Sequence, residues 1–145
     1  RTPLLVKWPG KISEGSRTDH VSAFWDLMPT LAEITGAEIP ENIDGISFLP
    51  TLLGKGKQQE HDYLFWEFHE QGGKMAVRMD KWKAVKLNIN RTPQGNTELY
   101  DLSTDIGETK NIADSFPEIV QKMEEIMQEA HVPSSVFPFV FEENR

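Results

Sequence analysis

The hydrophobic and polar positions change their periodicity along this chain, and the second half gives the clearer pattern. Beyond residue 62, four short runs rich in β-branched and aromatic residues are separated by turn residues, which is typical of strands. The runs cover residues 63–68, 75–79, 82–89 and 97–102. Because they follow one another closely, we expect them to pair antiparallel through hairpins.

One amphipathic helix is predicted after these runs. Apolar residues from Ile119 to Ala130 recur at i, i+1, i+4, i+7, i+8 and i+11, so they share one helix face. Asp114 or Ser115 is expected to cap this helix, with Pro117 near its first position. The pattern therefore predicts an α+β fold, a small four-stranded antiparallel sheet packed by a long C-terminal helix.

The first 53 residues give shorter and less regular signals. Residues 4–8 form an apolar run and residues 20–25 alternate, so both are predicted to be short strands. Asp26 is expected to cap a helix that ends at Gly36. Residues 46–53 are expected to form a short helix.

A polar, glycine-containing stretch separates the two halves. Residues 54–62 read GKGKQQEHD and lack apolar periodicity, which is typical of a linker. We therefore expect two parts, residues 1–57 and residues 58–145. The chain opens at Arg1 without an initiator Met and runs directly into an apolar stretch, as expected of a piece of a larger protein. The apolar strands of an incomplete first part lead us to expect self-association of the fragment.

Composition narrows the classes of protein that fit. The chain of 145 residues is 38% hydrophobic and 26% charged, which is ordinary for a soluble globular protein. The net charge of −8 argues against a nucleic-acid partner. The absence of cysteine excludes disulfides, thiolate metal sites and a cysteine nucleophile within this chain. No apolar run is long enough to span a bilayer, so no membrane partner is expected.

The predicted first hairpin of the sheet holds the best candidate for a site. Its tip, residues 67–73, reads EFHEQGG and gathers ionisable and amide groups beside a flexible glycine pair. His69 lies between Glu67 and Glu70, and a neighbouring carboxylate can tune an imidazole for acid, base or anion contacts. The alternative is an ordinary solvated loop histidine.

Other sequence motifs give no complete catalytic set. We find no HExxH, EF-hand, GxSxG or phosphate-loop motif, so we expect no catalytic residue and no metal ligand in this chain. The tryptophans invite a sugar-stacking interpretation, but their interleaving with aliphatic residues favours core packing. They are Trp8, Trp25, Trp66 and Trp82. Asn90 opens a sequence that matches a glycosylation sequon.

Four segments, taken in order, resemble the C-terminal part of a type I sulfatase of the arylsulfatase A or N-acetylgalactosamine-6-sulfatase kind. They read RTPLLVKWPG at residues 1–10, DLMPTL at 26–31 with DGIS at 44–47, WEFHEQGGKMAVRMDKWKAVK at 66–86, and ELYDL at 98–102 with the acidic turn that follows. The resemblance covers the chain up to the end of the predicted helix. Asp80 stands where the family often has a glycine, and Asp tolerates the left-handed conformation of such a turn.

The resemblance implies a fold and an activity. Residues 1–57 would be the C-terminal end of an alkaline-phosphatase-like α/β domain, and residues 58–145 the smaller C-terminal subdomain. It implies hydrolysis of a sulfated small molecule or glycan by a formylglycine nucleophile and bound calcium, all held by an N-terminal catalytic domain outside this chain. His69, and with it Glu67 or Gln71, would contact substrate at the pocket rim. By analogy the parent enzyme would be periplasmic or secreted.

Two rival interpretations remain open at this point. The first is a carbohydrate-binding module without catalysis that uses Trp66, Trp82 and the hairpin loop. The second is part of a phosphodiesterase or phosphonate hydrolase of the same superfamily.

Overall fold

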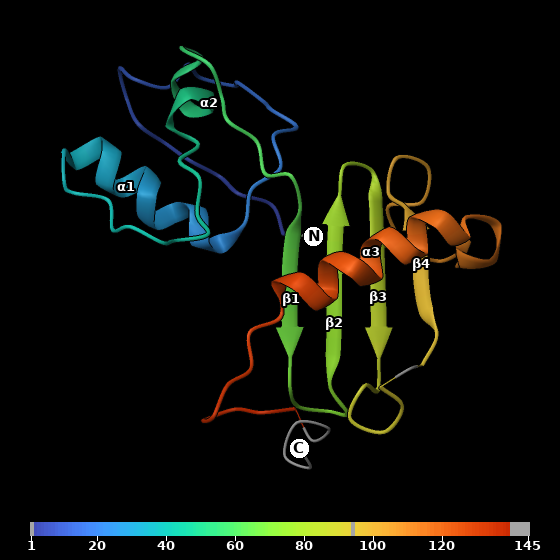
Figure 1. The fold of residues 1–145 in the computed structure, drawn as a ribbon. Helices are drawn as coiled ribbons and strands as arrows, with labels where there is room; N and C mark the ends of the chain where they lie inside the picture. Colours follow the sequence, from blue (N-terminus) through green and yellow to red (C-terminus); the bar gives the residue numbers. More distant parts are fainter. Residues whose placement is uncertain (1, 94, 140–145) are drawn as a thin grey trace. The chain divides into compact units, whose positions relative to one another are not determined.

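The computed structural model describes residues 2–93 and 95–139, and it divides into two compact units (Figure 1). Unit 1 is Arg1–His61 and unit 2 is Asp62–Arg145. In chain order the elements are η1 (Phe24–Asp26), α1 (Leu27–Thr35), α2 (Leu49–Leu53), β1 (Leu64–Phe68), β2 (Lys74–Met79), β3 (Trp82–Leu87), β4 (Thr97–Asp101), η2 (Ala113–Ser115) and α3 (Pro117–Ala130), where η denotes a 3-10 helix. No helix among the described residues is both long and apolar enough to cross a membrane.

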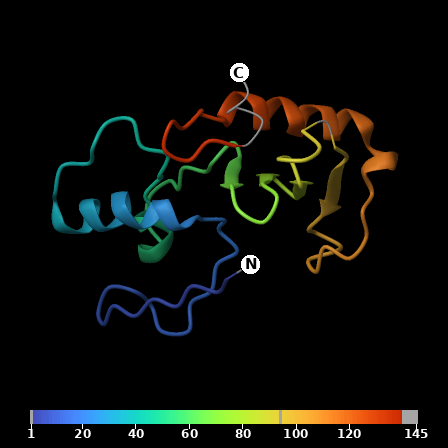
Figure 2. The same cartoon turned by 90° about the horizontal axis from the view of Figure 1, so that it is seen from below.

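Unit 2 has the predicted architecture. Its four strands form an antiparallel sheet in the order β1-β2-β3-β4, so every neighbouring pair is a hairpin or a short connection. Helix α3 lies along one face of this sheet, as both views show (Figures 1 and 2). The predicted α+β fold, with four strands and a long C-terminal helix, is confirmed.

The core of unit 2 lies between the sheet and α3. Alternate side chains of each strand point toward the helix, because successive residues of a strand face opposite sides. Paired residues Val77, Ala84 and Leu99 have no exposed surface and meet Met123 of α3, which is also fully buried. Full burial of each large apolar side chain contributes about 1.5–3 kcal/mol.

Phe139 of the tail also belongs to this core, although residues 132–145 carry no periodicity that predicts it. Its side chain has no exposed surface and packs in the cluster of buried residues beneath α3. The part of the tail after Phe139 lies outside the described residues.

The start of α3 differs from the prediction in its cap. Asp114 and Ser115 lie in the preceding turn η2, and the N-cap residue is Phe116, which makes no side-chain cap hydrogen bond. The amide oxygen of Asn111 accepts N–H groups from Leu99 and Ala113, at 3.0 Å each. This contact turns the chain before the expected cap position, so the prediction of an Asp114 or Ser115 cap is wrong.

Unit 1 contains the predicted helix but not the predicted strands. Helix α1 ends at Gly36, which has φ of +70° as expected of a left-handed C-terminal cap. Residues 4–8 and 20–23 are irregular, and Leu5 is 94% exposed. Both strand predictions are wrong, because a strand forms only where a neighbouring backbone accepts its hydrogen bonds, and among the described residues none pairs with residues 4–7.

Asp26 organises unit 1 in an unexpected way. It is the N-cap residue of α1, as predicted, but it takes a helical conformation with φ of −74° and its side chain makes no cap hydrogen bond to the helix. Its side chain is buried and accepts N–H groups from Ala23 at 2.6 Å and Ile46 at 2.9 Å. Nε2 of His61 lies 2.8 Å from the same carboxylate. Asp26 therefore joins three separate segments of unit 1.

Candidate functional site

The β1–β2 loop that carries the candidate residues has a tightly defined backbone. Gln71, Gly72 and Gly73 have φ of +52°, +91° and +74°, a run of left-handed conformations that glycine adopts most readily. The carbonyl groups of Gly72 and Gly73 accept N–H groups from Asn90 at 3.0 Å and Ile89 at 3.2 Å. A side chain at Gly73 would lie 2.7 Å from Ile89, so this close approach requires glycine.

The His69 ring lies within a packed group of side chains. Its Nε2 is 3.2 Å from Oε2 of Glu67. One ring face stacks on Phe139 with centroids 3.8 Å apart and planes 11° apart, and Phe137 meets the ring edge-on at 6.3 Å. The backbone carbonyl of His69 accepts an N–H from the Asn90 amide at 3.1 Å. The ring is therefore held by polar and aromatic contacts together.

Glu67 lies between two histidines. While one carboxylate oxygen faces His69, the other lies 2.5 Å from Nδ1 of His131, the residue that follows α3. The exposed fractions of the three side chains are 19% for Glu67, 18% for His69 and 14% for His131. We refer to these three residues and Phe139 as the histidine cluster.

Gln71 lies on the same loop but outside the histidine cluster. It is exposed, and its side-chain oxygen accepts an N–H from Lys74 at 3.3 Å. The Lys74 ammonium also lies 5.4 Å from the centroid of the Phe68 ring. Of the three candidate residues, the structure thus brings Glu67 and His69 together and keeps Gln71 at the exposed end of the loop.

Sequence reasoning missed His131 and Phe139. His131 lies four residues after Met127, so it continues the apolar stripe of α3, and this spacing was the available signal that it faces the sheet. Phe139 gave no such signal, because it lies in an irregular segment whose position is decided by packing alone. Asn90, which opens the sequon, is engaged through its amide with the His69 carbonyl.

A second group of ionisable residues lies on β4 and in the connection after it. Burial, followed by the hydrogen bond to Glu98, raises the pKa of Tyr100 to about 12, so its hydroxyl stays protonated. Hydrogen bonds from Ser103 and Lys81 lower the pKa of Asp101. Hydrogen bonds from Lys110 and Thr109 lower the pKa of Asp105. These contacts fix the turn that leads toward η2.

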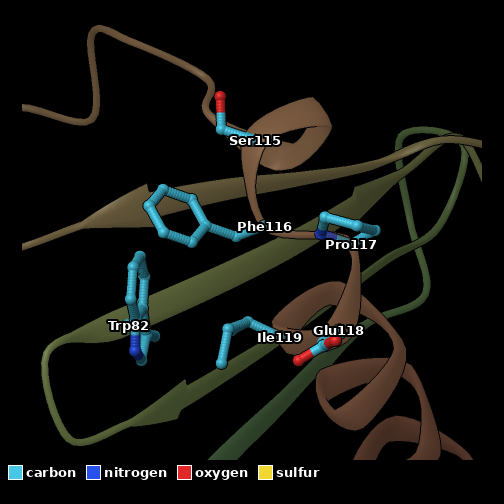
Figure 3. A pocket seen from close by; sticks show the side chains of 6 residues that line it. All are labelled: Trp82, Ser115, Phe116, Pro117, Glu118 and Ile119. Carbon is cyan, nitrogen blue, oxygen red and sulfur yellow. The ribbon is translucent and has the colours of Figure 1, made fainter.

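A shallow groove of about 450 Å³ lies at the start of α3 (Figure 3). Trp82 and Phe116 lie next to each other in its lining, with ring centroids 5.0 Å apart and planes tilted by 53°, and Ile119 lies beside them. The Lys81 ammonium lies 4.6 Å from the Trp82 ring. The carbohydrate-binding interpretation requires a free face of the Trp82 ring for a sugar. Here Phe116 and the Lys81 ammonium already contact that ring. None of the four tryptophans is fully buried, so the expected core packing is only partial.

No three His, Cys, Asp or Glu side chains in residues 2–93 and 95–139 are arranged to hold a metal ion. The histidine cluster has instead one carboxylate between two imidazoles, backed by an aromatic ring. Such an arrangement can orient an imidazole and fix which of its nitrogens carries hydrogen.

Comparisons with known proteins match most of this chain. The family model described as N-sulphoglucosamine sulphohydrolase, C-terminal, matches residues 1–132. Arylsulfatase A of Bos taurus is 35% identical over 82% of this chain and 27% of its own length. Delta 4,5-hexuronate-2-O-sulfatase of Bacteroides thetaiotaomicron is 31% identical over 77% of this chain and 24% of its own length.

Solved structures agree with the sequence comparisons. A structure of a 2-O GAG sulfatase matches with a TM-score of 0.62 and 28% identity, over 72% of this chain and 23% of that one. A phosphonate monoester hydrolase of Agrobacterium radiobacter matches with a TM-score of 0.53 at 23% identity, over 72% of this chain and 23% of that one. The latter likeness shows the fold alone.

The matched region lies in the C-terminal part of sulfatases, as the resemblance in the sequence predicted. The chain spans about a quarter of the length of the curated relatives that it matches, 27% and 24% in the two cases above. Its relatives are hydrolases of sulfate esters. The chain belongs to the family of N-sulphoglucosamine sulphohydrolase C-terminal domains.

Proposed function

We propose that this chain is the C-terminal part of an enzyme that hydrolyses aryl or carbohydrate sulfates, and that its β1–β2 loop contributes to the rim of the substrate pocket. The observation that carries the proposal is the family match over residues 1–132, together with sulfatase relatives above 30% identity. The chemistry of sulfate-ester cleavage belongs, in this proposal, to a part of the enzyme outside this chain.

An N-terminal catalytic domain is the partner that the proposal requires. It would supply the formylglycine nucleophile, the bound calcium and the groups that hold the sulfate. Residues 1–57 would be the end of that α/β domain. The exposed apolar side chains of unit 1 support this role, because Leu5 at 94%, Phe24 at 85% and Leu31 at 58% exposure offer surface for such a domain to cover.

The rim role of the β1–β2 loop rests on its construction. Loops held rigidly by a scaffold commonly carry binding residues. Here backbone hydrogen bonds from Ile89 and Asn90 hold the loop. The loop carries the imidazole of His69, which is held by its neighbours, and the exposed amide of Gln71. The Gln71 amide can donate to the oxygen atoms of a sulfated sugar or aryl sulfate, and an imidazole nitrogen that carries no hydrogen can accept a hydrogen bond from a sugar hydroxyl. By family analogy we further propose that the parent enzyme is periplasmic or secreted.

The test is the kinetics of the parent enzyme with a chromogenic aryl sulfate and a sulfated disaccharide. His69→Ala should lower kcat/KM several-fold for one of them, beyond any loss of folded protein, which a Tm measurement reports because the ring stacks on the buried Phe139. Glu70→Ala, on the same loop and exposed, is the matched control and should behave like the wild type. An unchanged kcat/KM in His69→Ala would remove the rim role.

Two further outcomes test the assignment itself. The 145-residue chain alone should hydrolyse neither substrate, because catalysis needs the whole constellation of groups. A parent enzyme that cleaves a phosphonate monoester and no sulfate ester would make the chain part of a phosphonate hydrolase instead.

A further inference from the structure

His131 is the member of the histidine cluster to which neither the sequence pattern nor the comparisons give a role. It follows the last residue of α3, and its backbone N–H closes the helix on Met127 at 3.2 Å. Its ring nitrogen Nδ1 lies 2.5 Å from Glu67 Oε1, and Glu67 Oε2 lies 3.2 Å from His69 Nε2. The carboxylate therefore links the end of the helix to the candidate substrate residue.

The hydrogen-bonding chemistry of this link fixes where the hydrogens lie. An ionised carboxylate only accepts hydrogen bonds, so each imidazole must donate through the nitrogen that faces Glu67. His131 then carries hydrogen on Nδ1, and His69 carries it on Nε2. In neutral His69 the other nitrogen, Nδ1, is a bare acceptor. That atom is buried and has no hydrogen-bond partner in residues 2–93 and 95–139.

Aromatic packing by Phe139 also holds the two histidine rings in place. Phe139, which has no exposed surface, stacks on His69 at 3.8 Å and tilts against His131 at 5.6 Å between ring centroids. A 180° flip of the His69 ring would keep its stacking on Phe139 but remove Nε2 from Glu67, and a smaller rotation would break the stacking. The ring thus has one orientation that satisfies both contacts.

We propose that His131 is a positioning residue that acts through Glu67 to hold the His69 imidazole in one orientation and one tautomer at the substrate rim. Its kinetic consequence rests on the proposed function, because it requires that His69 meets the substrate. The His131 ring contacts Glu67, and it acts on His69 through that carboxylate. Glu67 likewise acts on His69 here, since both its oxygens face histidine rings.

The first test observes the ring directly and needs no enzyme activity. Long-range ¹H–¹⁵N spectra of the 145-residue chain should show His69 with hydrogen on Nε2 and a bare Nδ1. His131→Ala should shift these signals toward a mixture of tautomers. His131→Asn, whose amide N–H can occupy the position of Nδ1, should restore them. His20→Ala, a histidine of unit 1, is the control and should leave them unchanged.

The second test measures kcat and KM separately in the parent enzyme. His131→Ala should raise KM several-fold for the substrate that responds to His69→Ala, and His131→Asn should return it toward the wild-type value. In a His69→Ala background, His131→Ala should add no further change, because it acts only through His69. A loss that is fully additive in that background would show an independent structural role and overturn the proposal.

The two arms separate the failure of this inference from that of the proposed function. A parent enzyme without sulfatase turnover overturns the proposed function, and the spectra then decide the positioning role alone. His69 signals in His131→Ala that match those of the wild type overturn the positioning role, whatever the activity.

Discussion

Asp26 in unit 1 and Val77 in unit 2 are both almost completely buried, but they stabilise their surroundings by different physics. Asp26 accepts directional hydrogen bonds from two backbone N–H groups and faces His61. Val77 lies on a central strand between its sheet neighbours and α3, and contributes through apolar burial. Unit 1 is thus organised around a carboxylate and unit 2 around an apolar core.

The exposed apolar side chains show the consequence. In unit 1, Leu5 is 94% exposed and Phe24 is 85% exposed, while helix α1 buries Pro29, Thr30 and Ala32 and leaves Leu31 58% exposed. In unit 2 the sheet and α3 cover each other, and the fully buried side chains come from both. The strongly exposed apolar side chains of unit 2 lie instead in its tail and connections, such as Val136 at 83% and Val132 at 76%. A few directional bonds hold the segments of unit 1 together, whereas an apolar layer between sheet and helix holds unit 2 together.

The largest expected effect is on backbone exchange. Amides of residues 4–7 should exchange at nearly unfolded rates, while amides of β2 and β3 should exchange roughly 1,000-fold slower or more, as expected for a unit with a stability of about 5 kcal/mol. Hydrogen exchange of the 145-residue chain measures both. Strong protection of residues 4–7 in a demonstrated monomer would contradict the comparison, and protection that appears only at high concentration would indicate self-association.

A substitution in the apolar core should destabilise unit 2 strongly. Leu99→Ala removes a side chain with no exposed surface that packs against α3, so it should lower the free energy of unfolding by about 2–5 kcal/mol. Denaturant unfolding measures the loss. Ile106→Ala, at a residue 54% exposed in the same unit, is the control and should change stability by less than about 0.5 kcal/mol. Equal losses of unfolding free energy in the two variants would contradict the burial of Leu99 in the core of unit 2.

The corresponding change in unit 1 is Asp26→Ala. It should lower the stability of unit 1 by about 2–3 kcal/mol, because it leaves the N–H groups of Ala23 and Ile46 without their acceptor. Faster exchange of the α1 amides, with unchanged protection of the sheet, is the expected signature. Asp44→Ala, an exposed carboxylate nearby in sequence, should leave the exchange of α1 as in the wild type.

The smallest expected effect is a pH dependence confined to unit 2. The pKa of Tyr100 is raised to about 12 in the folded chain, from about 10 when unfolded, because of burial and the Glu98 hydrogen bond. The protonated hydroxyl therefore stabilises the folded state fully below pH 10, and this contribution disappears as the pH rises from 10 to 12. Tyr100→Phe should unfold with a weaker alkaline dependence in this window. Identical alkaline profiles for the two proteins would rule out this contribution.

The architecture of unit 2 was predictable because its patterns are local. Alternation over five or six residues identifies a strand, and the stripe from Ile119 to Ala130 identifies α3. The tight turn was also predictable, since Asp80 takes φ of +52°, which Asp tolerates. In these elements the local conformational preference of each residue agrees with the conformation that tertiary packing requires of it.

The misses share one physical cause, because they depend on partners far away in sequence. Residues 4–8 have the composition of a strand, but the described part of the chain offers no strand to pair with them. Asp26 is the N-cap residue of α1 as predicted, yet its carboxylate oxygens face segments up to 35 residues away instead of the first turn of the helix. Local pattern cannot distinguish these outcomes.

The sequence by itself determined the periodicity of the sheet and of α3, the glycine-rich turn beside His69 and the sulfatase resemblance, since each depends on residues close together along the chain. Only the tertiary structure decided that Glu67 faces His131, 64 residues away, and that Phe139 stacks on His69. The reason is that a hydrogen bond or a ring stack requires particular atoms at particular distances, and only packing of the whole unit sets those distances.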